Sequence, residues 1–264
     1  MPETKDSQSS TVSEQTKSFY DDVGWTVTGD ATVDAQKWED LRACAETYVS
    51  ACRLRVLRHL PENGERLLDM ASGPIQYPEY LRFSEHFAKR VCVDLSERAL
   101  AIAQAKLGSR GEYLHGDFLE LNIASNSFDA AVSLHTIYHI DMARQAAAVR
   151  ELIRVTKPGA PIVVVYSNPR YPGAALLRIK RHLSKKPGDI YFHPFPLGWW
   201  QQFQDTAEVE IHPWRTFEAR TQKLLFPDNA VGRKMLAWLY ALEERFPAFF
   251  KSLGCYPMIV LRKR

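Results

Sequence analysis

The feature that most constrains the fold is a regular alternation of short apolar runs and helical segments over residues 66–166. The five apolar runs are RLLDMA, RVCVDL, EYLHGDF, FDAAVSL and PIVVVYS. The helical segments between them are PEYLRFSEHFAK, SERALAIAQAKLG and DMARQAAAVRELIRVTK. In the second of these helices, Ser96 is typical of an N-cap and Gly108 of a C-terminal stop. Strands that alternate with helices of this length predict a parallel sheet with helices on both faces.

Three further segments have a regular pattern. Residues 37–60 carry apolar side chains at every third or fourth position, which predicts one continuous helix, and residues 230–246 predict another. The runs AEVEIHPW and YPMIVLRK predict strands at residues 207–214 and 256–263. Residues 167–198 are rich in proline and glycine, and their aromatic side chains favour an ordered lid over a disordered segment.

Charge, hydropathy and cysteine usage exclude several classes of protein. A net charge of +3 over 264 residues is too small to indicate nucleic-acid binding. No run approaches the length of a membrane span, and the polar N-terminus lacks the apolar core of a signal peptide. The four cysteines form no CxxC pair, which favours buried reduced thiols over disulfides or a metal site; they are Cys44, Cys52, Cys92 and Cys255. We therefore expect a cytoplasmic protein without a metal.

The first apolar run leads into a candidate cofactor loop, LLDMASGPIQYPEYL, at residues 67–81. In an open parallel sheet, ligands bind beyond the carboxyl ends of the strands. Ala71, Ser72 and Gly73 are small enough for the backbone to approach a ligand, and Pro74 makes the turn rigid. Taken alone, the segment fits a core strand followed by a turn equally well.

Two acidic residues follow at the ends of the next two apolar runs. Asp94 comes about 20 residues after Gly73, where a carboxylate can accept hydrogen bonds from both hydroxyls of a ribose. The alternative role for Asp94 is to cap the next helix, although Ser96 already suits that role. Asp117 can accept from an adenine amino group, and Phe118 offers a backbone N–H and an apolar ring.

Together, the motifs resemble those of the class I S-adenosylmethionine-dependent methyltransferases in order and spacing. The matching segments are LLDMASGPI, VCVDLS, GDFLEL, FDAAVSLHTIYHI and ELIRVTKPGAPIVVV, within residues 60–170. The resemblance implies an α/β Rossmann-like fold: a doubly wound, mostly parallel seven-stranded sheet with an antiparallel C-terminal strand and an inserted lid. It implies an enzyme that transfers a methyl group from S-adenosyl-L-methionine to an O or N atom of a small-molecule acceptor, with S-adenosyl-L-homocysteine as the product.

The chain is expected to divide into a tail and a domain. The polar composition of residues 1–17, rich in Ser and Thr, predicts a disordered N-terminal tail, and residues 18–264 would be a single methyltransferase domain. Within that domain, residues 18–60 would form an N-terminal helical cap. Residues 167–206 and 215–253 would be lid or substrate insertions. The oligomeric state stays open.

The same resemblance assigns donor contacts residue by residue. Asp69 and the backbone of Ala71 and Gly73 would line the amino-acid end of the donor. Asp94 would hold the ribose, and Asp117 and Phe118 would hold the adenine. Tyr20, in FYDDVGW, resembles the N-terminal aromatic residue that closes over the methionine moiety in many relatives. The complete expected set is Tyr20, Asp69, Ala71, Gly73, Pro74, Asp94, Leu95, Asp117, Phe118 and His135.

The sequence departs from the family pattern in the first motif, where Ala71, Gly73 and Ile75 occupy the usual glycine positions. A nicotinamide dinucleotide is the alternative cofactor, and these residues disfavour it. A pyrophosphate needs helix N–H groups close by, whereas Pro74 lacks an N–H and Ile75 adds bulk. An NAD-dependent oxidoreductase and a non-catalytic donor-binding protein stay as alternatives. The ASGP segment also resembles the loop of small-molecule amine N-methyltransferases, over too short a stretch to choose a substrate.

The candidates for a catalytic base follow the fourth apolar run. Methyl transfer is an in-line displacement at a sulfonium, and an alcohol or ammonium acceptor must first lose a proton. His135, Tyr138 and His139 lie where the strand ends, and a histidine can titrate near neutral pH. For both histidines, a structural role is favoured over that of a general base. In this interpretation, His135 only shapes the pocket, and His139 packs beneath the next helix.

The expected lid offers further candidates. His193 lies within it, and of the adjacent Trp199 and Trp200 one is expected in the core and the other beside the acceptor. Basic side chains gather nearby and would attract an anionic acceptor, although a solvated helix face is the favoured interpretation. They are Arg170, Arg178, Lys180, Arg181, Lys185 and Lys186.

Overall fold

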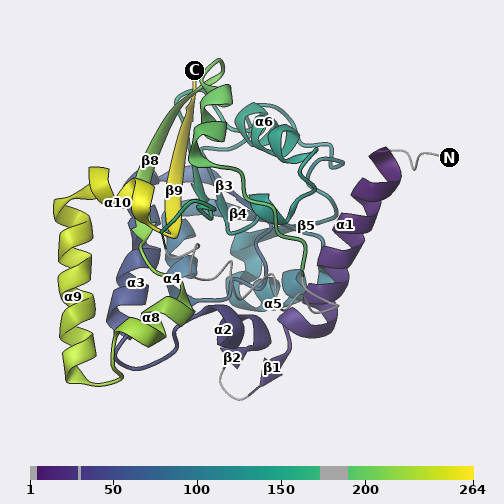
Figure 1. Ribbon diagram of the computed structural model, residues 1–264. Coiled ribbons are helices and arrows are strands. Elements are labelled where there is room, and N and C mark those ends of the chain that lie inside the picture. The colour runs from purple at the N-terminus through teal and green to yellow at the C-terminus, as the bar shows by residue number, and fades with distance from the viewer. Residues whose placement is uncertain (1–4, 29–30, 173–189) are drawn as a thin grey trace.

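A seven-stranded sheet organises the structure, a computed structural model that describes residues 5–28, 31–172 and 190–264 (Figure 1). The strand order is β5-β4-β3-β6-β7-β9-β8. The strands are β3 (Gly64–Met70), β4 (Phe87–Asp94), β5 (Gly111–His115), β6 (Ala130–Leu134), β7 (Pro161–Val165), β8 (Ala207–Arg215) and β9 (Tyr256–Lys263). Strand β9 is antiparallel to both β7 and β8, whereas the pairs among β3 to β7 are parallel. The predicted α/β fold, with one antiparallel C-terminal strand, is confirmed.

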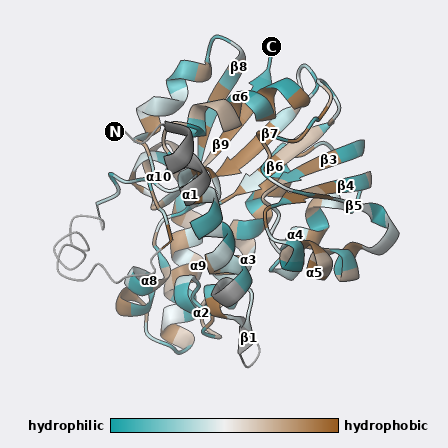
Figure 2. Ribbon diagram, turned by 90° about the vertical axis from the view of Figure 1, so that its right-hand side faces the viewer, coloured by the Kyte–Doolittle hydropathy of each residue, from teal (hydrophilic) through white to brown (hydrophobic). Residues whose placement is uncertain are grey.

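The central strands are apolar because both faces of the sheet are covered. Every residue of β7 is buried. Successive residues point to opposite faces, so that Leu68 and Val164 join one core cluster while Leu67 and Val163 join the other. Figure 2 shows the result as brown strands between helices of mixed polarity. All four cysteines are buried free thiols, as predicted.

The helices that connect the strands largely follow the sequence pattern. Helix α5 (Glu97–Leu107) begins at Ser96, whose Oγ accepts from the Ala99 N–H at 3.0 Å, and ends at Gly108 with φ +56°. Helix α6 is Gln145–Val155. The helix predicted over residues 78–89 is shorter, because α4 (Pro78–Leu81) and a 3-10 turn, η3 (Arg82–Ser84), give way to β4.

The single helix predicted over residues 37–60 is wrong. The chain forms α2 (Val33–Trp38), then α3 (Glu46–Leu54) and the 3-10 helix η2 (Arg55–His59). Helix α2 stops at Glu39, whose buried carboxylate is ion-paired with Arg53 and Arg215. Trp38, which the helical pattern placed on the apolar face, is 42% exposed. A buried ion pair with a distant strand therefore overrides the local helical periodicity.

The N-terminal segment also differs from the prediction. Residues 1–17 are predicted to be a disordered tail, whereas the structure has helix α1 (Lys5–Phe19) and a π-helical turn, η1 (Tyr20–Gly24). A two-stranded ribbon of β1 (Val27–Thr28) and β2 (Ala31–Thr32) leads into α2. In Figure 1, α1 stands on the side of the molecule where β5 and α5 lie.

The insertion between β8 and β9 forms a helical unit at the opposite side (Figure 1). It contains α8 (Ala219–Leu225), α9 (Ala230–Arg245) and α10 (Pro247–Leu253). A third hydrophobic cluster joins this unit to α3 through Tyr48, Val49, Leu236 and Leu239. The other insertion contributes a 3-10 helix, η6 (Leu197–Phe203). Across the described residues, no helix combines the length and hydropathy needed to cross a bilayer.

Candidate functional site

The loop after β3 has the backbone geometry of a glycine-rich turn although it contains one glycine. Ala71, Gly73 and Ile75 have φ values of 55°, 55° and 48°. Such left-handed conformations are costly for residues other than glycine and persist where the surrounding structure enforces them. Here Lys106 of α5 donates to the carbonyl oxygens of Pro74 at 2.8 Å and Ile75 at 2.7 Å. Tertiary contacts of Lys106 thus hold a loop whose backbone takes the left-handed conformation that favours glycine.

Asp94 connects this loop to the next helix. Its Oδ2 accepts from the Gly73 N–H at 2.8 Å, and its Oδ1 accepts from the Ser96 N–H at 2.9 Å. Burial raises the pKa of Asp94 to about 6, against the lowering effect of these two hydrogen bonds. A carboxylate has about four acceptor positions, so that Asp94 can still accept from a ligand. The capping role and the ligand role are therefore compatible in one side chain.

The η1 turn covers the loop. Trp25 lies against Gly73, since a Cβ added there would be 3.1 Å from the indole ring. Tyr20 stacks on Trp25 with ring centroids 4.7 Å apart. The buried Nε1 of Trp25 has no hydrogen-bond partner among the described residues. A buried donor of this kind is costly unless a ligand atom accepts from it, which fits a polar ligand held between η1 and the loop.

A side-chain contact fixes η1 in this position. The Ser96 Oγ donates to the Asp21 carboxylate, and Arg98 donates to the Asp21 carbonyl oxygen at 3.0 Å. The fold therefore brings together Tyr20, Gly73 and Asp94, which were predicted to share one site.

Two of the expected donor contacts are engaged elsewhere. The Asp69 carboxylate is buried in an ion pair with Arg90, with Oδ2 2.5 Å from Nη2. Asp117 is ion-paired with Arg144 at 2.8 Å, and its other oxygen accepts from the Leu119 N–H at 2.9 Å. Asp69 therefore fastens β3 to β4 inside the sheet, and an adenine contact from Asp117 would compete with Arg144.

The neighbours of Asp94 and Asp117 also have definite places. The Phe118 ring is buried in the core beneath β3 and β4. The carbonyl oxygen of Leu95 accepts from His115 Nε2 at 3.0 Å. Pro74, whose carbonyl oxygen is held by Lys106, completes the loop. All three therefore have contacts within the protein, and their expected role in donor binding stays a prediction.

His135 lies at the carboxyl end of β6, next to β3, where the strand order reverses. Its backbone φ of 60° is a strained value for a residue other than glycine. Its imidazole ring makes edge-on contacts with the rings of Trp214 and Tyr256, each with its centroid 5.0 Å away. Its Nδ1 is 2.9 Å from the Tyr138 hydroxyl. Ligands of open α/β sheets bind at this point of reversal.

The electrostatics of the two histidines differ from expectation. Burial and then the positive charge of Arg215 lower the pKa of His135 to about 3. Burial lowers the pKa of His139 to about 4, and its Nδ1 donates to the Tyr191 carbonyl oxygen at 2.6 Å. Both rings are therefore neutral near pH 7 and weak as bases. A neutral His135 does not repel a sulfonium cation.

Tyr138 contacts residues of the segment that the sequence predicts to be a lid. The Tyr138 ring is buried, and its carbonyl oxygen accepts from the His193 N–H at 2.8 Å. Trp200 is fully buried in the core, whereas the half-buried Trp199 stacks on Phe195 at 5.0 Å. Of the expected basic cluster only Arg170 is described. The others, Arg178, Lys180, Arg181, Lys185 and Lys186, lie outside the described residues.

Three functional candidates were missed by the sequence analysis. Trp214 and Tyr256 belong to β8 and β9, which the sequence predicts as core strands without suggesting that their rings meet His135. Asp34, the third, lies in α2 beside the loop: its carboxylate is a long 3.5 Å from Gln76 Nε2, which also donates to Thr32 at 2.5 Å. Burial raises the pKa of Asp34 to about 6. Its helix, VDAQKW, contains other polar residues, so no sequence pattern distinguishes Asp34.

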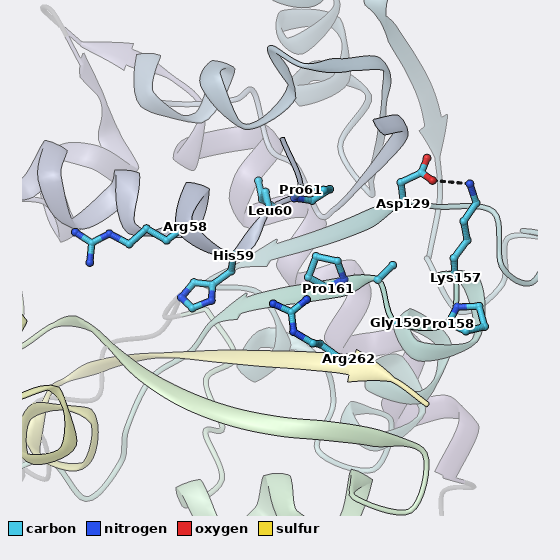
Figure 3. A pocket seen from close by; sticks show the side chains of 11 residues that line it. Arg58, His59, Leu60, Pro61, Asp129, Lys157, Pro158, Gly159, Pro161 and Arg262 are labelled. Atoms are coloured by element: carbon cyan, nitrogen blue, oxygen red, sulfur yellow. Dashed lines mark hydrogen bonds and ion pairs between the residues drawn. The ribbon is translucent and has the colours of Figure 1, made fainter. Parts of the chain in front are cut away.

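A separate pocket of about 440 Å³ lies at the other end of the sheet (Figure 3). Arg58, His59 and Arg262 line it, together with Asp129, which forms an ion pair with Lys157 at 2.5 Å. Asp129 precedes β6, so that the pocket is at the amino ends of the parallel strands. It is therefore distinct from the site around Gly73 and His135, which is at their carboxyl ends.

The family model of the methyltransferase domain matches residues 68–164. Demethylmenaquinone methyltransferase of Corynebacterium glutamicum is 34% identical over 163 residues, which cover 57% of this chain and 68% of that protein. The enzyme of the same name from Clavibacter sepedonicus is 34% identical over 115 residues, 42% of this chain and 45% of its own length. The chain thus spans less than half of that relative.

Solved structures share the fold at low sequence identity. A SAM-dependent methyltransferase from Thermotoga maritima, described as a possible histamine N-methyltransferase, has a TM-score of 0.56 and 16% identity, covering 83% of this chain and 92% of its own. The [4+2]-cyclase SpnF has a TM-score of 0.53 and 19% identity, covering 81% of each chain. The family model, the Corynebacterium relative and the sheet topology together show that this chain belongs to the class I S-adenosylmethionine-dependent methyltransferases.

Proposed function

We propose that this chain transfers a methyl group to a quinone-type ring in its reduced, hydroxyl-bearing form. Support comes from the relatives named demethylmenaquinone methyltransferase. The observation that carries the proposal is the position of His135, strained at the end of β6 and in edge-on contact with Trp214 and Tyr256. Aromatic rings in such arrangements attract a flat aromatic acceptor.

The loop and the η1 turn would hold the methyl donor. Asp94 accepts from ribose hydroxyls, the backbone at Gly73 allows close approach, and Tyr20 with Trp25 closes over the opposite side. When bound, S-adenosylmethionine supplies an activated methyl group on a sulfonium. Because the thioether leaves as a neutral molecule, the residues of this chain act mainly by aligning the two substrates and excluding water.

Asp34 is the proposed base. It is half-buried near the loop, and its charge acts on Tyr20 and Tyr138, whose pKa values are raised first by burial. The negative charge of Glu39, by contrast, is balanced by ion pairs with Arg53 and Arg215. Removal of the ring-hydroxyl proton by Asp34 gives a phenolate whose charge is shared between the oxygen and ring carbons. Either atom can then displace the thioether, so the acceptor atom is oxygen or carbon rather than nitrogen.

The test is methyl transfer to a short-chain 1,4-naphthoquinol under anaerobic conditions. S-adenosylhomocysteine formation is measured by mass spectrometry, and NMR of the product identifies the methylated atom. Histamine serves as the amine comparison, and the Asp94→Ala variant as the donor-site control. Quinol-dependent turnover that the control lacks supports the proposal. Turnover with the amine alone, or donor binding without turnover on either acceptor, overturns it, and the latter result favours the non-catalytic donor-binding alternative.

A further inference from the structure

Helix α9 has an apolar stripe that faces away from the protein. Val231, Met235 and Trp238 follow one another at steps of four and three, which puts them on one side of the helix. Val231 is 59% exposed and Trp238 is 67% exposed. Leu236 and Leu239, on another side, are buried against α3. The exposed stripe is therefore additional to the face by which α9 packs.

The apolar surface continues into α10. Phe246 and Phe249 are 51% and 61% exposed, and they follow the stripe of α9 directly in the chain. Large exposed aromatic side chains gathered on neighbouring elements mark an interaction surface more often than scattered ones. We call these five residues, Val231, Met235, Trp238, Phe246 and Phe249, the α9–α10 surface.

The charges around this surface are mainly positive. Exposed basic residues of α9 include Lys234 and Arg245, which neighbour Met235 and Phe246 in the chain. Of the acidic residues of the same helix, Glu243 is buried in an ion pair with Arg55, and the exposed Glu244 is ion-paired with Arg55 and Arg58. Apolar and aromatic side chains flanked by basic ones are typical of helices that lie in the interface of an anionic membrane.

The insertion is also connected to the proposed acceptor site. It begins directly after Trp214 and Arg215 at the end of β8 and returns to the sheet at Tyr256 of β9. The same two strand ends provide the rings that contact His135. Docking of the insertion on a surface would therefore bring that surface close to one wall of the site.

We propose that the α9–α10 surface docks on a lipid bilayer containing anionic headgroups, with α9 lying flat in the interface. The purpose of this docking, access to an acceptor dissolved in the membrane, rests on the proposed function, whereas the docking itself is tested separately. Two copies docked through this surface would carry the same positive charges, Lys234 and Arg245, on both sides of the interface. The positive charge therefore favours the membrane as the occupant.

The experiment is flotation of the full chain with vesicles of phosphatidylcholine alone and of phosphatidylcholine mixed with phosphatidylglycerol. Binding is expected only to the anionic vesicles and to weaken with added salt. The double variant Met235→Ser/Trp238→Ser should reduce the bound fraction roughly tenfold or more. Lys234→Gln and Arg245→Gln should each reduce it roughly fivefold.

Matched controls lie elsewhere on the surface. Met142→Ser removes a side chain that is 53% exposed outside the α9–α10 surface, and Arg110→Gln removes an exposed charge at the β5 edge. Neither should alter vesicle binding. Circular dichroism and donor affinity of each variant show whether the fold and the donor site are retained. A water-soluble quinol should be methylated equally by the wild type and the Met235→Ser/Trp238→Ser variant.

Three results would overturn the inference. They are absence of vesicle binding, binding that the α9 substitutions leave unchanged, and a dimer in solution that these substitutions dissociate. Because flotation does not depend on turnover, docking without quinol methylation would reject the proposed function while supporting the surface. Methylation of a soluble quinol without flotation would support the proposed function and reject membrane docking by the α9–α10 surface.

Discussion

The carboxylate of Asp94 accepts a hydrogen bond from the backbone N–H of Gly73 over 2.8 Å, which ties the end of β4 to the donor loop after β3. One group therefore shapes the loop and faces the position expected for the ribose. Its second oxygen is bound to the Ser96 N–H, so that the start of α5 is fixed by the same side chain. Predictions about donor binding follow from this contact.

Substitution Asp94→Asn should weaken S-adenosylmethionine binding roughly 10- to 100-fold, because hydrogen bonds to a charged acceptor are lost. Asparagine retains one oxygen for the Gly73 N–H, so the fold should persist. Calorimetric titration measures the affinity, and a melting curve checks the fold. An unchanged affinity would remove Asp94 from the ribose site.

Donor binding should also depend on pH. The raised pKa of Asp94, about 6, means that the carboxylate is ionised at pH 7 and becomes protonated as the pH falls through 6. Protonation removes acceptor positions, so affinity should fall about tenfold for each pH unit below the pKa. Titrations between neutral and mildly acidic pH should show this slope in the wild type but not in Asp94→Asn. The same slope in both proteins would contradict the assignment.

Substitution Gly73→Ala should destabilise the protein by about 1–2 kcal/mol, because alanine is strained at positive φ. The added Cβ would also lie 3.1 Å from the Trp25 ring. Trp25→Ala should remove that crowding, so the double variant should lose less stability than the two single variants added together. Denaturant melts measure all three, and strict additivity would show that Trp25 does not press on the loop.

Substitution Asp34→Asn should reduce turnover roughly 100-fold or more and leave donor affinity unchanged, since a general base contributes to the chemical step. The pKa of Asp34, about 6, predicts that the wild-type rate falls as the pH drops below that value. Asp205→Asn, an exposed carboxylate paired with Arg150, is the matched control and should be active. Full activity of Asp34→Asn would assign the base elsewhere.

The local pattern of the chain was enough to predict the sheet. Apolar runs such as PIVVV specify strands covered on both faces, and Ser96 and Gly108 specify where α5 begins and ends. These features depend on residues close in the sequence. The same reasoning failed at residues 39–45, because Glu39 is held by Arg215, which the chain reaches only through β8.

The sequence by itself determined the order of strands and helices, the loop at Gly73 and the acidic residue that ends β4, because periodicity and spacing are local properties. Only the tertiary structure decided what each ionisable group does. It paired Asp69 with Arg90 and Asp117 with Arg144, lowered the pKa of His135 by burial, and left Asp34 beside the loop. The physical reason is that burial and ion pairing depend on partners far away in the sequence, which only folding brings together.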